Sequence, residues 1–358
     1  MDTLTHALSG ALAARATGAN QPAPGALTRR ARMWVGFWAA AFPDSDFIVR
    51  FIDPLLYLTT HRGITHSVIM LPLWAAILAW LFFAFFRGQH RWREFVGICA
   101  IGIGIHIVGD VVTAFGTMVF APLSDWRLQI PTTFIIDPYF TAILAAGLIA
   151  SAFWKLSRRP ALIALAVLAA YVGFQGLMHQ RAIGIGERYL AAQGLTAVEV
   201  SAVPQPFSPF HWMIVVSEPQ QYRLAYVSLT RSQTPAPPAD DAFWFTRIAS
   251  AYRPTDALLW KEVPRFGRSP MEVDLASEVW HSEMFARFRR FALYPAVYRI
   301  DQESARTCVW FNDLRFALFG RNMPFRYGAC RAASDGAWEV YRLLGEGNDE
   351  ARDRVQHL

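Results

Sequence analysis

Apolar residues in the first half of the chain gather into six runs separated by short polar connections. The runs lie at residues 4–16, 33–42, 67–86, 95–108, 139–154 and 161–178. A helix that crosses a bilayer needs about 20 apolar residues, and the runs at 67–86 and 161–178 satisfy this requirement. The shorter runs suit tilted helices, partial spans or helices sheltered inside a bundle. The pattern predicts a polytopic α-helical membrane domain over residues 1–180.

After residue 180 the pattern changes to short runs of β-forming residues interrupted by prolines. Strand character is found at 212–216, 222–229, 295–301 and 307–319, and helical character at 256–260 and 273–291. Three prolines within residues 234–241 predict an exposed loop. This alternation predicts a smaller α+β domain over residues 181–358.

Composition agrees with a membrane protein, because 54% of the residues are hydrophobic and only 17% are charged. Ordinary soluble domains contain roughly 25% charged residues. Residues 1–6 carry an aspartate and no Lys or Arg, so we expect no secretory signal peptide. The apolar runs themselves are then expected to direct insertion.

Basic residues predict the orientation of the apolar runs. If the runs alternate in direction, one set of connections holds ten basic residues: Arg15, Arg29, Arg30, Arg32, Arg87, Arg91, Arg93, Lys155, Arg158 and Arg159. The other set holds only three, Arg50, Arg62 and Arg127. Because basic connections stay in the cytoplasm, the second set and the C-terminal domain are predicted to lie outside.

Side chains suited to metal binding recur at the ends of the runs, on the predicted outer face. They are Asp2, His6, Asp44, Asp46, His61, His66, His106, Asp110 and Asp137. Two His/Asp pairs among them have i, i+4 spacing, which places both side chains on one face of a helix. Imidazole and carboxylate donors without thiolate suit Zn²⁺, with Mn²⁺ and Fe²⁺ as further candidates. The set is larger than one tetrahedral ion needs, so it could hold two or more ions.

Such a cluster suits hydrolysis at phosphorus. Bound metal ions lower the pKa of their water and hold both sides of an in-line displacement. Asp46 is the expected base or bridging ligand, and Arg62 and Arg127 are expected to hold an anionic phosphoryl oxygen.

The motifs resemble, in the same order, those of the YdjM-like family of membrane-bound metal-dependent hydrolases. They are DTLTH, PDSD, HRGITHS, HIVGDVVTAFGT, APLSDWR and FIIDP. HIVGD is also similar to the HxxGD element of zinc-dependent phospholipases C and P1-type nucleases, which cleave phosphoesters with a zinc cluster. The resemblance implies that His106 and Asp110 are metal ligands, and that the site is completed by His61, His66, His6, Asp2, Asp44 and Asp46. The chain lacks the further downstream histidines of that soluble group.

We therefore expect a multi-pass protein of the bacterial inner membrane that hydrolyses a phosphoester of a lipid or lipid-linked substrate from the outer side. The alternatives are a membrane metal transporter or metal-binding protein, and a non-catalytic envelope scaffold with a structural metal. Nucleic-acid binding is not expected, because the pI of about 9.4 arises largely from arginines that the predicted topology already explains.

Cysteine usage leaves two alternatives open. Cys99 lies in an apolar run, whereas Cys308 and Cys330 both lie in the C-terminal part. In an oxidising compartment the latter two could form a disulfide. They could equally be two unpaired thiols.

Overall fold

Two units divide the chain in the computed structural model, which describes residues 1–195, 199–239, 241–319, 321, 323–332, 336–345 and 350–355. The helical unit comprises Met1–Phe47, Thr60–His179 and Pro206–Pro209. The sheet unit comprises Ile48–Thr59, Gln180–Gln205 and Phe210–Leu358. A short stretch near residue 50 therefore leaves the helical unit and packs with the second half of the chain.

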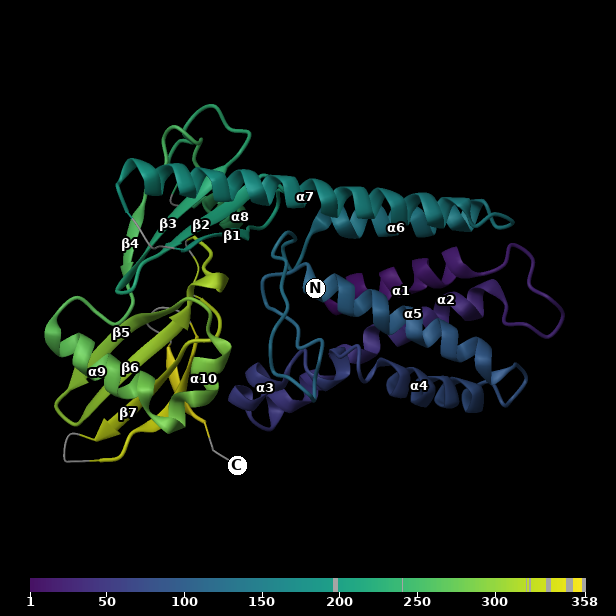
Figure 1. The fold of residues 1–358 in the computed structure, drawn as a ribbon, viewed down its shortest axis with the longest axis horizontal. Helices are drawn as coiled ribbons and strands as arrows, with labels where there is room; N and C mark the ends of the chain where they lie inside the picture. The colour runs from purple at the N-terminus through teal and green to yellow at the C-terminus, as the bar shows by residue number, and fades with distance from the viewer. Residues whose placement is uncertain are drawn as a thin grey trace. The chain divides into compact units, whose positions relative to one another are not determined.

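Each of the six apolar runs folds as a helix, as predicted. These are α1 (Thr3–Thr17), α2 (Arg29–Ala41), α4 (Leu71–Phe85), α5 (Trp92–Val111), α6 (Pro138–Phe153) and α7 (Arg159–Ala192). Within the helical unit, α1, α2, α4 and α5 pack side by side, and α6 packs beside α1 (Figure 1). Leu144 and Leu168 are buried in one apolar cluster, so α6 also packs on the first part of α7.

Only two of these helices, among the described residues, are long and apolar enough to cross a membrane alone. They are α5, with 20 residues, and α7, with 34 residues. A third crossing arises if the segments Pro54–His66 and Leu71–Phe85, which meet at a 77° bend, count as one broken span. The helix α6 is apolar but has only 16 residues. The predicted six-span topology therefore stays a prediction.

The bend before α4 shortens the run that the sequence predicts at 67–86. Ser67 Oγ donates to the carbonyl oxygen of Ala121 at 2.5 Å and accepts the N–H of Ile69 at 3.1 Å. These bonds fix a turn at residues 67–70, and α4 begins only at Leu71. The helix therefore begins four residues after the start of the apolar run.

Close contact between α1 and α2 depends on two glycines. A Cβ atom on Gly10 would lie 2.2 Å from the carbonyl oxygen of Gly36, and a Cβ on Gly36 would lie 2.5 Å from that of Gly10. Any side chain at either position would separate the helices. Small residues at helix crossings are typical of membrane proteins, whose helices gain stability mainly by close packing.

The sheet unit contains two antiparallel meanders. The first has the order β1-β2-β3-β4, formed by Glu199–Pro204, His211–Ser217, Gln221–Ser228 and Lys261–Pro264. The second has the order β5-β6-β7-β8-β9, formed by Pro295–Glu303, Arg306–Asp313, Tyr327–Ala332, Glu339–Leu344 and Ala351–Arg354. The short helix α3 (Pro54–Thr60) begins in this unit, where Tyr327 Oη donates to the Pro54 carbonyl at 3.2 Å.

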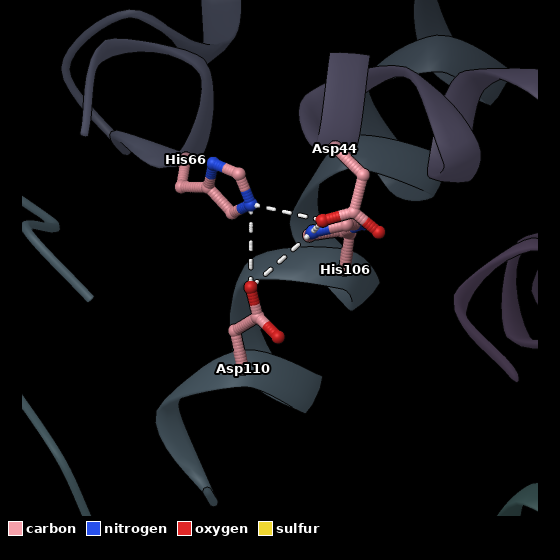
Figure 2. A group of neighbouring side chains, drawn as sticks. All are labelled: Asp44, His66, His106 and Asp110. Atoms are coloured by element: carbon pink, nitrogen blue, oxygen red, sulfur yellow. Dashed lines mark ion pairs between the residues drawn. The ribbon is translucent and has the colours of Figure 1, made fainter. Parts of the chain in front are cut away.

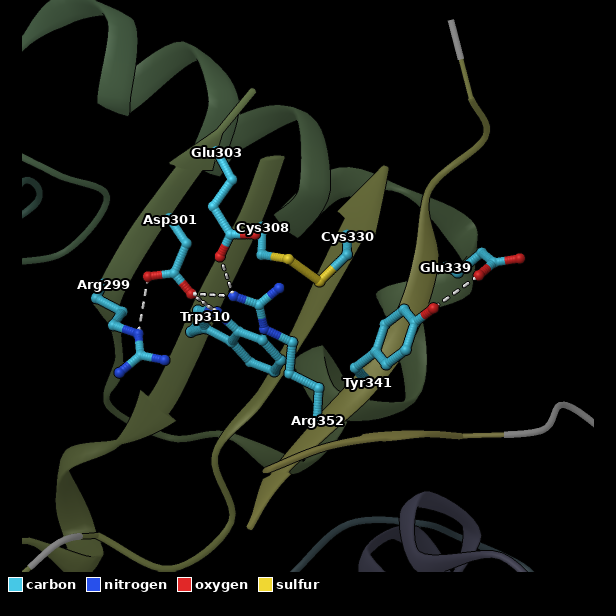
Figure 3. The surroundings of a disulfide bond; sticks show 9 residues. All are labelled: Arg299, Asp301, Glu303, Cys308, Trp310, Cys330, Glu339, Tyr341 and Arg352. Atoms are coloured by element: carbon cyan, nitrogen blue, oxygen red, sulfur yellow. Dashed lines mark hydrogen bonds and ion pairs between the residues drawn. A yellow bond between two sulfur atoms is a disulfide. The ribbon is translucent and has the colours of Figure 1, made fainter. Parts of the chain in front are cut away.

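The second sheet has two different faces. On one face α9 (Pro270–His281) and α10 (Ala286–Phe291) enclose an aromatic cluster in which the rings of Trp280, Phe285 and Phe311 meet. On the other face a disulfide joins Cys308 of β6 to Cys330 of β7, beside Trp310 (Figure 3). Of the two alternatives for these cysteines, the structure has the disulfide.

The predicted strands at 212–216, 222–229 and 295–301 are confirmed as β2, β3 and β5. The strand predicted at 307–319 is β6, but it ends at Asp313, whose carboxylate accepts the N–H of Arg315 and starts a turn. The helix predicted at 256–260 was wrong, because this stretch is a turn without helix. The helix predicted at 273–291 is divided at Ser282 into α9 and α10.

Candidate metal site

Four side chains from three segments meet at one end of the helical unit. Asp44 comes from the 3-10 helix η1 (Phe42–Phe51) and His66 from the 3-10 helix η2 (Ile64–His66). His106 and Asp110 lie one turn apart on α5. One donor atom from each residue can be chosen so that all four lie within 4.8 Å of one another (Figure 2).

The distances between these donor atoms are those expected around one shared metal ion. Asp110 Oδ2 lies 3.3 Å from His66 Nε2 and 3.4 Å from His106 Nε2. Asp44 Oδ1 lies 3.6 Å from each of the same two nitrogens. In a tetrahedral site with metal–ligand bonds of about 2.0–2.1 Å, donors lie about 3.3–3.4 Å apart. The four side chains are therefore close to the spacing that a tetrahedral ion requires.

The burial of these four side chains also favours a bound cation. His66, His106 and Asp110 are fully buried, and Asp44 is 14% exposed. His66 Nε2, His106 Nε2 and Asp110 Oδ2 have no hydrogen-bond partner within the described part of the chain. Buried polar atoms without a partner are costly, and a cation among the three would satisfy all of them. The cluster could thus hold a divalent metal ion.

Hydrogen bonds on the far side of each imidazole orient it toward the cluster. His106 Nδ1 donates to the carbonyl oxygen of Ala40 at 2.6 Å, so Nε2 is the ring nitrogen that faces the cluster. His66 Nδ1 lies 2.9 Å from Thr65 Oγ1. Metal-binding histidines ordinarily have such a partner on the second nitrogen, since it fixes the tautomer and the ring plane.

Asp44 is held in its charged form. Burial on its own would raise the pKa of this carboxyl. Contact with His66 and the charges of His106 and His6 outweigh burial, so the pKa lies below its usual value. Thr3 Oγ1 also donates to Asp44 Oδ2 at 2.6 Å.

His6 lies against the cluster rather than within the group of four. Its ring stacks on His106 with centroids 3.6 Å apart, and its Nε2 lies 2.9 Å from Asp110 Oδ1. The N-terminal nitrogen of Met1 contacts the same carboxylate oxygen. A Cβ on Gly109 would lie 3.1 Å from His6 Cε1, so α1 and α5 approach closely here.

Arg62 forms a buried ion pair with Asp110. Its Nη2 lies 2.9 Å from Asp110 Oδ1, and its Nη1 donates to Thr113 Oγ1 at 2.7 Å. The side chain is only 2% exposed and lies over the ring of Phe115. In this position Arg62 neutralises Asp110, whereas the sequence predicts that it holds a phosphoryl oxygen.

Asp46 and His61 form a second, partly exposed pair beside the group of four. His61 Nδ1 lies 2.8 Å from Asp46 Oδ1, and the side chains are 13% and 11% exposed. Asp46 Oδ2 accepts the N–H of Arg62 at 3.1 Å and lies 3.6 Å from His66 Nδ1. The pair therefore adjoins the group of four through His66.

Three other predicted site residues have different partners. Asp2 caps α1 by accepting the N–H of Thr5 at 3.0 Å. Asp137 caps α6, and its second oxygen accepts a hydrogen bond from Gln175 at 2.8 Å. Arg127 donates to the carbonyl oxygens of His61 and Gly116 at 3.2 Å each. Sequence reasoning missed Thr113, which lies just after the end of α5 and whose backbone N–H and hydroxyl both donate to the carbonyl oxygen of Asp110.

The fold and the donor set define a helical membrane protein whose first half could bind a metal ion at one end of its helices. The chain belongs to the family described as YdjM inner membrane protein, whose family model matches residues 1–182. The predicted family is thereby confirmed, and the chain is an inner membrane protein.

The chain is also similar to a curated protein over about half of its length. "Uncharacterized protein YfhP" of Bacillus subtilis (strain 168) is 25% identical over 179 residues, which are 49% of this chain and 52% of the relative. The chain thus matches about half the length of that relative. No solved structure matches the chain.

Proposed function

We propose that this protein is a membrane-bound metal-dependent hydrolase that cleaves a phosphoester in a lipid or lipid-linked substrate. The observation that carries the proposal is the convergence of three buried donor atoms that have no hydrogen-bond partner among the described residues, His66 Nε2, His106 Nε2 and Asp110 Oδ2. Two imidazoles and two carboxylates at near-tetrahedral spacing suit Zn²⁺. When bound, such an ion supplies Lewis acidity and lowers the pKa of coordinated water.

The chain's own proton-transfer group in this proposal is His61. Its hydrogen bond with Asp46 holds one ring nitrogen, as a carboxylate does for a catalytic imidazole. Both side chains are partly exposed, whereas the three buried donors are not. His61 and Asp46 therefore lie where a substrate would approach, and Asp46 acts by orienting His61.

The outer face of the inner membrane is the proposed location of the site. The basic connections at the opposite ends of the helices support this orientation. The Cys308–Cys330 disulfide in the sheet unit supports it independently, because disulfides persist in oxidising compartments. A site at the end of membrane helices is reached most directly by a substrate that is itself anchored in the outer leaflet.

Metal content tests the site directly. We expect the purified full chain to retain zinc, and His66→Ala and His106→Ala each to lower its metal content severalfold by elemental analysis. His90→Ala is the matched control, since His90 precedes the opposite end of α5 from the site, where it donates to the Gly25 carbonyl and contacts the rings of Phe86 and Phe95. Equal metal content in all four proteins would contradict the site.

Activity is tested separately on bis(p-nitrophenyl) phosphate and on phospholipid in mixed micelles. We expect His61→Ala to lower turnover about 10²–10⁴-fold, the range for loss of a general acid–base group, while metal content stays unchanged. Metal-loaded wild type that hydrolyses no phosphoester would contradict the hydrolase. Metal flux into proteoliposomes by such a protein would favour a transporter instead.

A further inference from the structure

A basic cavity lies at the end of the helical unit opposite the candidate metal site. It has a volume of about 540 Å³ and is lined by the last turn of α1, the start of α2 and the last turn of α6 with the residues that follow. The α1–α2 and α6–α7 connections meet at this end (Figure 1). Arg158 N donates to Asn20 Oδ1 at 2.8 Å, which joins the two connections.

The charged residues that line the cavity are all cations: Arg15, Arg29, Arg30 and Lys155. Glu94 of α5 is an acidic residue that bonds to the α1–α2 connection. Its carboxylate accepts the N–H of Leu27 at 3.0 Å and does not line the cavity. No acidic side chain that lines the cavity therefore balances its positive charge.

Arg15 is built into the cavity wall. It is only 3% exposed, and its Nη2 donates to the carbonyl oxygens of Lys155 and Ser157 at 3.2 and 2.5 Å. Its Nη1 is buried without a hydrogen-bond partner in the described residues, as are Arg29 Nη1 and Ser151 Oγ. Three donors without acceptors thus surround one cavity, and an anion there would satisfy them.

Two features of the walls indicate a phosphate group. The first turn of α2, capped by Thr28, lies at the cavity, and the amino end of a helix attracts anions. Guanidinium groups bind phosphate oxygens through paired N–H donors. Next to Lys155, the apolar side chains of Phe153, Trp154 and Leu156 are exposed, which is typical of residues at the level of lipid headgroups.

We propose that this cavity binds the phosphate of an anionic phospholipid headgroup, in the leaflet opposite the candidate metal site. The binding site is independent of the proposed hydrolase activity, since it uses different residues at the other end of the helices. The phosphate monoester of phosphatidic acid is the simplest headgroup with the chemistry that the cavity requires.

Competition binding with the full chain in mixed micelles tests the proposal. A phosphatidic acid with a fluorescent acyl chain is the probe, and unlabelled phosphatidic acid, phosphatidylcholine and inorganic phosphate are the competitors. We expect phosphatidic acid to compete at least tenfold better than phosphatidylcholine, and inorganic phosphate only at far higher concentration. Equal competition by phosphatidylcholine would overturn the site. Inorganic phosphate that competes as well as the lipid would overturn the headgroup assignment.

Two double variants that remove the same charge, one inside the cavity and one outside it, test whether the lipid binds in the cavity. Arg29→Gln combined with Arg30→Gln should weaken binding about tenfold or more, the loss expected for one charge-assisted hydrogen bond. Arg91→Gln combined with Arg93→Gln removes the same charge from exposed positions outside the cavity and should change binding less than twofold. Equal weakening in the two double variants would show diffuse attraction and overturn the proposal.

Discussion

Replacing Arg62 by methionine tests how the buried charges of the site are balanced. Arg62 and Asp110 are 2% and 0% exposed, and the guanidinium also bonds to Thr113 Oγ1. Removing one partner of a buried ion pair costs about 3–5 kcal/mol, because the other charge loses compensation; beside Asp110, the Met1 nitrogen and His6 would remain. In a unit of this size, each kcal/mol lowers the unfolding midpoint by about 2–4 °C. We therefore expect Arg62→Met to lower the midpoint by about 6–20 °C.

The assay is thermal unfolding of the purified full chain in detergent, with and without a chelator. A cation bound beside Asp110 would replace part of the lost compensation, so the destabilisation should be larger after chelation. Arg93→Met, which changes an exposed arginine at the start of α5, should shift the midpoint by less than 2 °C. A similarly small shift for Arg62→Met in chelator would refute the charge balance described here.

Three further predictions use the same unfolding assay. Gly36→Val should destabilise the chain by about 1–3 kcal/mol, because its Cβ would meet the Gly10 carbonyl, whereas Gly97→Val, with nothing near its Cβ, should have little effect. Cys308→Ala should lower the stability of the sheet unit by about 3 kcal/mol, since the lost disulfide closes a loop of 22 residues, and near-UV circular dichroism would follow this transition. Asp137→Ala should cost about 1–3 kcal/mol through the lost cap of α6 and leave metal content unchanged, whereas reduced metal content would return Asp137 to the ligand set.

Hydropathy alone predicted the six helices of the first half, because an apolar run of this kind forms a helix wherever water is excluded. It could not predict where α4 begins. The start of that helix depends on bonds from Ser67 to residues near 120, which are distant in sequence. Similarly, residues 256–260 have the composition of a helix and form a turn, since tertiary contacts outweigh weak local propensity.

The candidate site was predicted as a set of nine residues, of which the structure brings four into mutual contact. Asp44 follows one apolar run and Asp137 precedes another, so both lie at the boundary of a run. An aspartate there suits a helix cap as well as a metal ligand, and the sequence does not distinguish the two. The distinction lies in whether the carboxylate faces backbone N–H groups, as in Asp137, or imidazole nitrogens, as in Asp44.

The order of the donors along the chain has a consequence for biosynthesis. Asp44 leaves the ribosome well before His66, and the last donor, Asp110, appears only when α5 has been made. The group of four donors is incomplete until that point, so α1 and α2 can associate before any ion is bound. Their contact at Gly10 and Gly36 needs no charged group. This pair of helices can therefore form first, and the donors made later can assemble beside it.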